Sequence, residues 1–230
     1  MSSEVGKRAR GCKVAVVTFP GTNCDHDLEH VAGDLFGCAV EKVWHRGTTL
    51  NGPDIVFLPG GFAYGDYLRT GALAALSPIM GAVKEFAANG GVVVGICNGF
   101  QILCEAQLLP GALLPNAHGS FAARWVEISV NTGAASLSAI SDGTMIRCPV
   151  AHGEGNYFAD PETLDDLERN RQIVFRYRSG ENPNGSVRDI AGISNRRGNV
   201  IGLMPHPERA CEAVQGDDSG RVLFEALLRR

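Results

Sequence analysis

The sequence lacks the features that would place it in a membrane or on nucleic acid. Its apolar runs are all far shorter than the ~20 residues needed to cross a bilayer. The first residues, MSSEVGKRARGC, are basic but contain no apolar stretch of the kind found in secretory signals. The formal net charge is -4, so no basic excess favours nucleic acid. We therefore expect a cytoplasmic chain that binds neither membranes nor nucleic acid.

The sequence also has no metal or disulfide framework. Its cysteines contain no CxxC pair; the seven lie at positions 12, 24, 38, 97, 104, 148 and 211. We expect reduced thiols, most of them buried as small hydrophobic side chains. His26 and His30 lie four residues apart beside Cys24, a spacing that suits a metal, but no third ligand is evident, so no metal site is expected.

Nucleotide-binding signatures are missing as well. Neither PGGFAYG nor GICNGF matches G-x-G-x-x-G, and no Walker A sequence occurs. Direct ATP binding by this chain is therefore disfavoured, and we expect no cofactor on it.

What the sequence does contain is an alternation of strands and helices in its first half. Strands are predicted at 13–19, 39–44, 54–61 and 91–96, the last two as buried strands, with helices at 25–36, 77–90 and 98–109. After Pro115 the pattern changes to alternating strands and closes with a helix at 218–230. We expect an α/β fold: an open, mostly parallel, doubly wound sheet with helices on both faces and a small antiparallel extension. Residues 1–230 are expected to form a single domain, with 1–11 as a flexible lead-in.

The stretch VVVGICNGFQI places Cys97 at a turn from a strand to a helix. G-I-C-N-G has the pattern of the G-x-S-x-G nucleophile elbow, in which Gly95 and Gly99 remove side chains that would clash. The start of the helix favours a thiolate and can hold an oxyanion. We expect an exposed thiol, with the N–H groups of Asn98 and Gly61 as oxyanion donors. The motif alone leaves a buried structural cysteine about equally favoured.

A reactive thiolate that transfers acyl groups needs a base, and His206 is the best candidate among six histidines. In LMPHPERA, two prolines predict an extended, stiff segment at the end of a strand. In such a segment Glu208 lies on the same face as His206 and can orient the imidazole. In isolation, the HPE segment is more typical of solvated polar residues at the point where a strand passes into a loop. Among the other histidines, His152 in VAHGEGN lies among glycines, which suits either a structural turn or a ligand contact.

Taken together, these segments resemble the class I (triad) glutamine amidotransferases. PGGFAYGDYLR, CNGFQIL, PVAHGEGN and MPHPERA resemble in particular the small glutaminase subunits of phosphoribosylformylglycinamidine synthase, over nearly the whole chain. The resemblance implies Cys97 as the nucleophile, His206 as the base and Glu208 as its orienter, with Gly61 and Asn98 forming the oxyanion hole. It also implies a glutamine pocket; its substrate-binding residues are Gly60, Phe62, Gln101, His152 and Gly153. Residues 116–124 match the family loosely.

The activity implied by this resemblance is hydrolysis of glutamine to glutamate and ammonia. The ammonia would pass to a large synthetase subunit, which holds ATP and Mg and converts formylglycinamide ribonucleotide to formylglycinamidine ribonucleotide in purine biosynthesis. A small accessory subunit is also implied. The subunit ratio, the ammonia route and the need for docking are left open.

The sequence is also compatible with three alternative functions. The chain could serve another acceptor as a glutaminase subunit of the same class. It could be a non-catalytic doubly wound module that binds a small molecule or regulates a partner. It could also be a redox sensor, since a thiol at a helix start suits that role, although a sensor leaves the HPE segment without a purpose.

Overall fold

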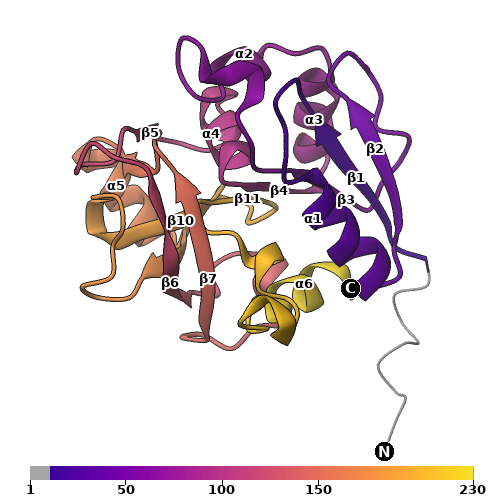
Figure 1. The fold of residues 1–230 in the computed structure, drawn as a ribbon. Coiled ribbons are helices and arrows are strands. Elements are labelled where there is room, and N and C mark those ends of the chain that lie inside the picture. The colour runs from indigo at the N-terminus through magenta and orange to yellow at the C-terminus, as the bar shows by residue number, and fades with distance from the viewer. Residues whose placement is uncertain (1–10, 230) are drawn as a thin grey trace, which may run out of the picture.

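The computed structural model describes residues 11–229, so the expected lead-in lies outside the described residues except for Gly11. One nine-stranded sheet runs through this part of the chain (Figure 1). Five neighbouring strands are parallel, in the order β2 (Ala39–Trp44), β1 (Lys13–Thr18), β3 (Ile55–Leu58), β4 (Val92–Ile96) and β11 (Val200–Leu203). Four antiparallel strands continue the sheet, in the order β10 (Ile190–Ser194), β9 (Ile173–Tyr177), β6 (Ala122–Val130) and β7 (Met145–His152).

Helices cover the parallel strands on both faces. The helices of the described chain are α1 (Asp25–Glu29), α2 (Ala72–Ala75), α3 (Ile79–Ala88), α4 (Asn98–Glu105), α5 (Pro161–Arg169) and α6 (Arg221–Leu228). Figure 1 shows α3 and α4 on one side of the parallel strands and α1 and α6 on the other. A π-helical turn, His30–Leu35, extends α1, and a separate two-stranded ribbon pairs β5 (Ala112–Leu114) with β8 (Asn156–Phe158). None of the described helices has the length and apolar character needed to span a membrane.

Burial along the strands follows from this arrangement. Every residue of β3, β4 and β11 is buried, because helices cover both faces of a parallel sheet. In β6, buried positions alternate with more accessible ones over most of the strand, as expected where one face of an antiparallel sheet is open. Continuous apolar runs therefore predicted the centre of the sheet, and alternation predicted its antiparallel end.

The predicted α/β fold, a mostly parallel doubly wound sheet with an antiparallel extension, is confirmed. The extension is more integral than expected, because β10 pairs directly with β11 and carries the central sheet onward. Helix α5 was missed, although its start carries a clear signal: Asp160 accepts a hydrogen bond from the N–H of Thr163, and Pro161 occupies the first turn.

Candidate active site

Cys97 lies in a strained turn between β4 and α4. Strand β4 ends at Ile96, helix α4 begins at Asn98, and Cys97 between them has φ 53° and ψ -108°. A positive φ is uncommon for a residue other than glycine and costs on the order of 1 kcal/mol or more. The predicted strand-to-helix turn is therefore present, and its strain is of the kind found in nucleophile elbows.

Two glycines make this turn possible. A methyl group on Gly95 would lie 2.5 Å from the carbonyl oxygen of Gly99, and one on Gly99 would overlap the carbonyl of Leu58. Both obstacles are backbone atoms, which cannot move aside without distorting β3 or α4. The glycines thus allow α4 to begin directly against the end of the sheet.

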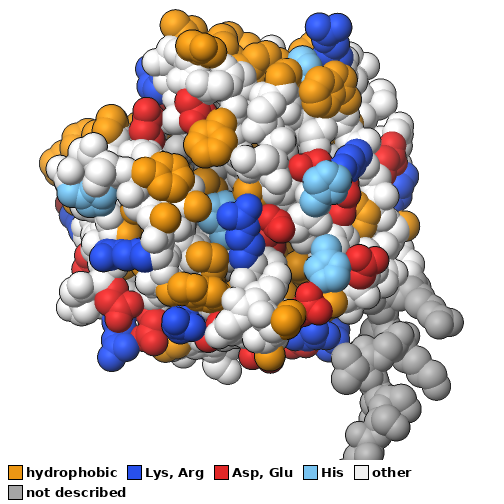
Figure 2. Space-filling view, in the orientation of Figure 1, with side chains coloured by type: hydrophobic (Ala, Val, Ile, Leu, Met, Phe, Trp, Pro, Cys, Tyr) orange, Lys and Arg blue, Asp and Glu red, His pale blue; other side chains and the backbone are white. Residues whose placement is uncertain are grey.

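The expectation of an exposed thiol was wrong, because Cys97 is only 4% exposed. Its Sγ lies 3.8 Å from the carbonyl oxygen of Ala151 on β7, so the antiparallel strands cover the turn. Cys97 instead faces a pocket of about 180 Å³, which we call the Cys97 pocket; it is lined by Asn23, Cys24, Gly61, Phe62, Cys97, Phe121, Ala151, His206 and Arg209. Phe62 and Phe121 are partly exposed, and hydrophobic side chains gather on this face in Figure 2.

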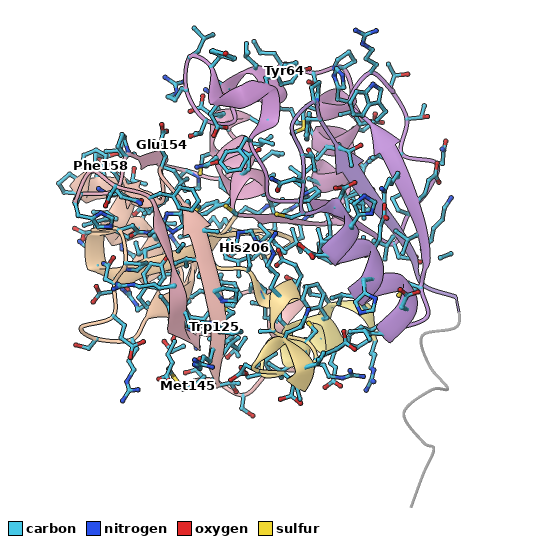
Figure 3. All side chains as sticks on the ribbon, in the orientation of Figure 1. Tyr64, Trp125, Met145, Glu154, Phe158 and His206 are labelled. Atoms are coloured by element: carbon cyan, nitrogen blue, oxygen red, sulfur yellow. The ribbon has the colours of Figure 1, made fainter. Side chains whose placement is uncertain are left out.

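His206 and Glu208 form a buried pair in the same pocket. Nδ1 of His206 lies 2.6 Å from Oε1 of Glu208, and both side chains are almost fully buried. His206 is labelled near the centre of Figure 3, between the helical half and the β6–β7 half of the molecule. The backbone prediction was only partly right: Pro207–Arg209 form a 3₁₀ turn rather than an extended segment. This turn brings Glu208 back toward the ring.

The surroundings of His206 favour a charged imidazole. Burial by itself lowers the pKa of His206, but the negative charges of Glu208 and Cys97 outweigh it, so the pKa is raised well above its ordinary value. The Nε2 atom of His206 and the Oε2 atom of Glu208 are buried without a hydrogen-bond partner among the described residues. The ring nitrogen not held by Glu208 is therefore free for chemistry.

The loop after β3 is held close to this pair. A methyl group on Gly60 would lie 2.7 Å from Cε1 of His206 and 3.4 Å from Cβ of Cys97, so Gly60 leaves room for both side chains. Gly61 has φ 148°, and a methyl group there would lie 2.7 Å from the carbonyl oxygen of Gly21. Asn98 anchors the loop, because its Oδ1 accepts a hydrogen bond of 3.1 Å from the N–H of Ala63.

Comparison with known proteins places the chain in a family. A family model described as a CobB/CobQ-like glutamine amidotransferase domain matches residues 11–221. The chain belongs to this glutamine amidotransferase family. It is 52% identical to "Phosphoribosylformylglycinamidine synthase subunit PurQ" of Moorella thermoacetica, covering 94% of this chain and 95% of that one. It is 53% identical to the protein of the same name from a Chelativorans species, covering 95% and 99%.

A solved structure has the same fold as this chain. The amidotransferase chain superimposes with a TM-score of 0.85 on a chain of "Structure of PurLQS from Thermotoga maritima", at 41% identity, covering 94% of this chain and 97% of that one. At this identity and coverage the neighbour matches the architecture across almost the whole described fold.

The residues predicted to bind glutamine lie in two places in this amidotransferase. Gly61 and Phe62 line the Cys97 pocket, and Gly60 lies beside it. Gln101 is buried behind the pocket: its Oε1 accepts from Nδ2 of Asn98 at 2.8 Å, and its Nε2 donates to the carbonyl of Glu154. Its side-chain amide thus joins the start of α4 to the loop after β7.

His152 and Gly153 belong to a buried network. Nδ1 of His152 lies 3.1 Å from Oδ1 of Asn116, and the carbonyl of Gly153 accepts from the N–H of Asn116. Burial, with a smaller contribution from the charge of His206, lowers the pKa of His152 to about 4, so the ring is neutral near pH 7. Neither residue lines the Cys97 pocket, and their binding roles stay predictions.

Sequence reasoning missed several residues around the site. Cys24 and Arg209 line the pocket, and Asn116 connects the His152 network to the N–H of Gly155. Cys24 follows the carboxyl end of β1, so its place after a parallel strand was an available signal. His30, considered with Cys24, instead bonds Asp34 and Glu212 through its two ring nitrogens.

A larger hollow of the described surface lies elsewhere. A cavity of about 680 Å³ lies beside the end of α4 and β5, next to the ion pair of Arg69 and Glu105. Cys104 lines it, but burial raises the pKa of that thiol strongly, which makes it a poor nucleophile. We therefore take the smaller Cys97 pocket, where the Cys97 thiol meets the His206–Glu208 pair, as the candidate active site.

Proposed function

We propose that this chain is a glutaminase subunit of phosphoribosylformylglycinamidine synthase. It hydrolyses glutamine through Cys97, His206 and Glu208 and delivers ammonia to a synthetase, which makes formylglycinamidine ribonucleotide from formylglycinamide ribonucleotide with ATP in de novo purine (IMP) biosynthesis. The observation that carries this proposal is the buried His206–Glu208 pair, 2.6 Å apart, in the pocket that Cys97 faces. The names of the relatives support the choice of acceptor.

The reaction begins at the sulfur of Cys97. Its thiolate attacks the side-chain amide carbon of glutamine, and a carbon–sulfur bond forms as the carbonyl π electrons move to oxygen. The N–H groups of Gly61 and Asn98 receive this oxyanion. Asn98 suits the role because it is the first residue of α4, where backbone N–H groups have no partner within the helix.

His206 carries out both proton transfers of the reaction. The imidazolium donates its proton to the departing nitrogen, the carbon–nitrogen bond breaks, and ammonia leaves a glutamyl thioester on Cys97. The neutral ring then takes a proton from water, which attacks the thioester and releases glutamate. Glu208 keeps Nδ1 of His206 occupied, so that the other ring nitrogen performs both transfers.

The glutamine pocket is formed by Gly60, Phe62, Gln101, His152 and Gly153 in this proposal. Gly61 and Phe62 line the space next to Cys97, while Gln101 and His152 reach the substrate only if their present hydrogen bonds are exchanged. Such an exchange suits an enzyme whose pocket is completed when a partner docks. Low activity of the isolated chain is therefore part of the proposal.

The partners follow from the fate of ammonia, which water would protonate. A large synthetase subunit carries ATP and Mg and uses the ammonia, and a small accessory subunit completes the assembly. The name PurLQS, which the Thermotoga maritima neighbour carries, supports an assembly of this kind. We place the assembly in the cytoplasm, in keeping with the free thiols of all seven cysteines of this chain.

Glutamine hydrolysis by wild type and Cys97→Ser, each with and without the synthetase, tests this proposal. We expect the partner to raise the wild-type rate and the variant to lose at least about a thousandfold. Ammonium chloride should still support synthesis by the variant complex. Equal rates in wild type and variant would remove Cys97 as nucleophile, and coupling to a different acceptor would reassign the pathway.

An electrophilic glutamine analogue offers an independent check of the active cysteine. Mass spectrometry should find a single adduct on Cys97, and glutamine should protect against its formation. The absence of an adduct on Cys97 would favour a non-catalytic binding module instead.

A further inference from the structure

A second thiol faces the proposed catalytic pair. Cys24 precedes α1, and its Sγ, a ring nitrogen of His206 and a carboxylate oxygen of Glu208 all lie within 4.8 Å of one another. All three side chains are buried. The glutaminase mechanism uses His206 and Glu208 but gives Cys24 no role.

Cys97 lies close to the same two side chains, Cys24 and His206. A methyl group on Gly60 would lie 2.7 Å from Cε1 of His206, 3.0 Å from Sγ of Cys24 and 3.4 Å from Cβ of Cys97. Because Glu208 already holds Nδ1, Nε2 is the ring nitrogen of His206 that is left for a ligand.

This nitrogen is available to a ligand. Nε2 of His206 is buried and has no hydrogen-bond partner among the described residues. Glu208 holds the opposite nitrogen at 2.6 Å, which is the carboxylate–histidine arrangement that orients metal-binding imidazoles. Two cysteine sulfurs and one imidazole nitrogen are ligands that Zn²⁺ prefers.

We propose that Cys24, Cys97 and Nε2 of His206 form a Zn²⁺ site, with Glu208 orienting the imidazole and water as the fourth ligand. Tetrahedral zinc places a sulfur and a nitrogen ligand about 3.5 Å apart. The Sγ of Cys24 and a ring nitrogen of His206 already lie within 4.8 Å of each other, so small side-chain rotations bring this pair to that spacing.

The charges around Cys24 suit this site. Nη2 of Arg209 donates to Sγ of Cys24 at 3.1 Å, and Nε of Arg209 bonds Asp27 at 2.9 Å. Thiolates are the metal-binding form of cysteine, and a guanidinium is a compatible neighbour for an anionic sulfur. Two thiolates balance the charge of Zn²⁺, and Asp27 pairs with Arg209.

Occupation of this site blocks glutamine hydrolysis, because the metal takes both the nucleophile and the free nitrogen of the base. This consequence rests on the proposed function, whereas binding itself does not. Zn²⁺ would therefore act as a reversible inhibitor of this chain, and Cys24 would set how tightly the inhibitor binds.

Metal binding by the purified, chelator-stripped full chain tests the site. Zn²⁺ affinity is measured by competition with a coloured chelator, and Co²⁺ is added to look for thiolate-to-cobalt charge-transfer absorption. We expect wild type to show both signals, and Cys24→Ser and Cys24→Ala to bind at least about tenfold more weakly. Wild type without affinity, or Cys24 variants with wild-type affinity, would overturn the proposal.

Cys12→Ser is the matched control, because Cys12 precedes β1 at the opposite end of the parallel strands and interacts with Cys38. Its affinity should equal that of wild type. If Cys12→Ser loses the metal instead, the cation is bound by Cys12 and Cys38 and the proposal is wrong.

Two further measurements separate this site from variant misfolding and from the proposed function. X-ray absorption of the wild-type zinc complex should count two sulfur ligands, and one or none contradicts the site even if the Cys24 variants do not fold. Glutaminase activity of the metal-free wild type tests the proposed function alone. Inhibition by Zn²⁺, relative to each variant's own metal-free rate, should weaken at least about tenfold in the Cys24 variants.

Discussion

Gly99 of α4 lies directly against the backbone carbonyl of Leu58 at the end of β3, so closely that a methyl group on Gly99 would overlap the carbonyl. This contact holds the first turn of α4 onto the sheet. Cys97 is strained at φ 53° because the helix begins here, and the strained turn directs its thiol into the Cys97 pocket. A substitution at Gly99 should therefore change both the stability of the fold and the geometry of the turn at Cys97.

We predict that Gly99→Ala lowers the free energy of unfolding by about 2–3 kcal/mol or more, since a backbone clash cannot relax by side-chain rotation. Glutaminase activity should fall as well, because α4 must move. Urea unfolding and steady-state kinetics measure the two effects. Gly81→Ala is the matched control: Gly81 lies exposed in α3 with no atom within 4 Å of an added methyl group, so helix propensity predicts a gain of up to about 1 kcal/mol. Equal effects at the two glycines would contradict the clash.

We predict that Glu208→Gln lowers kcat by about 10²–10⁴-fold, because the amide no longer stabilises a charged His206. The pH dependence of stability gives a second readout. The pKa of His206 is raised in the folded chain, as the charges of Glu208 and Cys97 outweigh the opposing effect of burial. The folded state therefore binds this proton more tightly than the unfolded state, so the stabilisation is complete below about pH 6.5 and is lost as pH rises through the folded pKa.

Urea unfolding of wild type and Glu208→Gln at pH 6 and pH 9 measures this linkage. The difference in unfolding free energy should be about 3 kcal/mol at pH 6 and smaller at pH 9. A difference that stays constant or grows with pH would show that the pair does not stabilise a protonated imidazole.

We predict that Asn98→Ala lowers kcat by about 10- to 100-fold with little change in KM, because the N–H of Ala63 loses its acceptor and the loop that carries Gly61 loosens. Steady-state kinetics with glutamine separates the two parameters. Asn170→Ala, at the end of α5, provides the control and should leave both unchanged. A rise in KM without a fall in kcat would assign Asn98 to substrate binding instead.

We predict that Asn116→Ala raises KM for glutamine and lowers the free energy of unfolding by about 2–3 kcal/mol. Asn116 satisfies several buried groups at once, including the carbonyl of His152 and the N–H of Gly155, which would otherwise be left unpaired. Urea unfolding and kinetics test both effects. Asn195→Ala in the turn between β10 and β11 should cost less stability and leave KM unchanged. An unchanged KM in Asn116→Ala would separate the His152 network from the glutamine pocket.

The sequence by itself determined the local geometry. Gly95 and Gly99 around Cys97 predict a tight strand-to-helix turn because only glycine avoids the backbone there, and the structure has that turn. Continuous apolar runs predict the parallel strands because both faces of such a sheet are covered. The pairing of His206 with Glu208 was also predicted, although the backbone that achieves it is a 3₁₀ turn.

Only the tertiary structure decided what surrounds these local elements. The burial of Cys97 depends on β7, more than 50 residues later in the chain, and the approach of Cys24 to His206 depends on which strand ends are neighbours in the sheet. Local propensity contains no information on strand order, because order is set by packing between distant segments. The sequence therefore predicted the strand-to-helix turn at Cys97 and the pairing of His206 with Glu208, while only the fold revealed the thiol of Cys24 beside them.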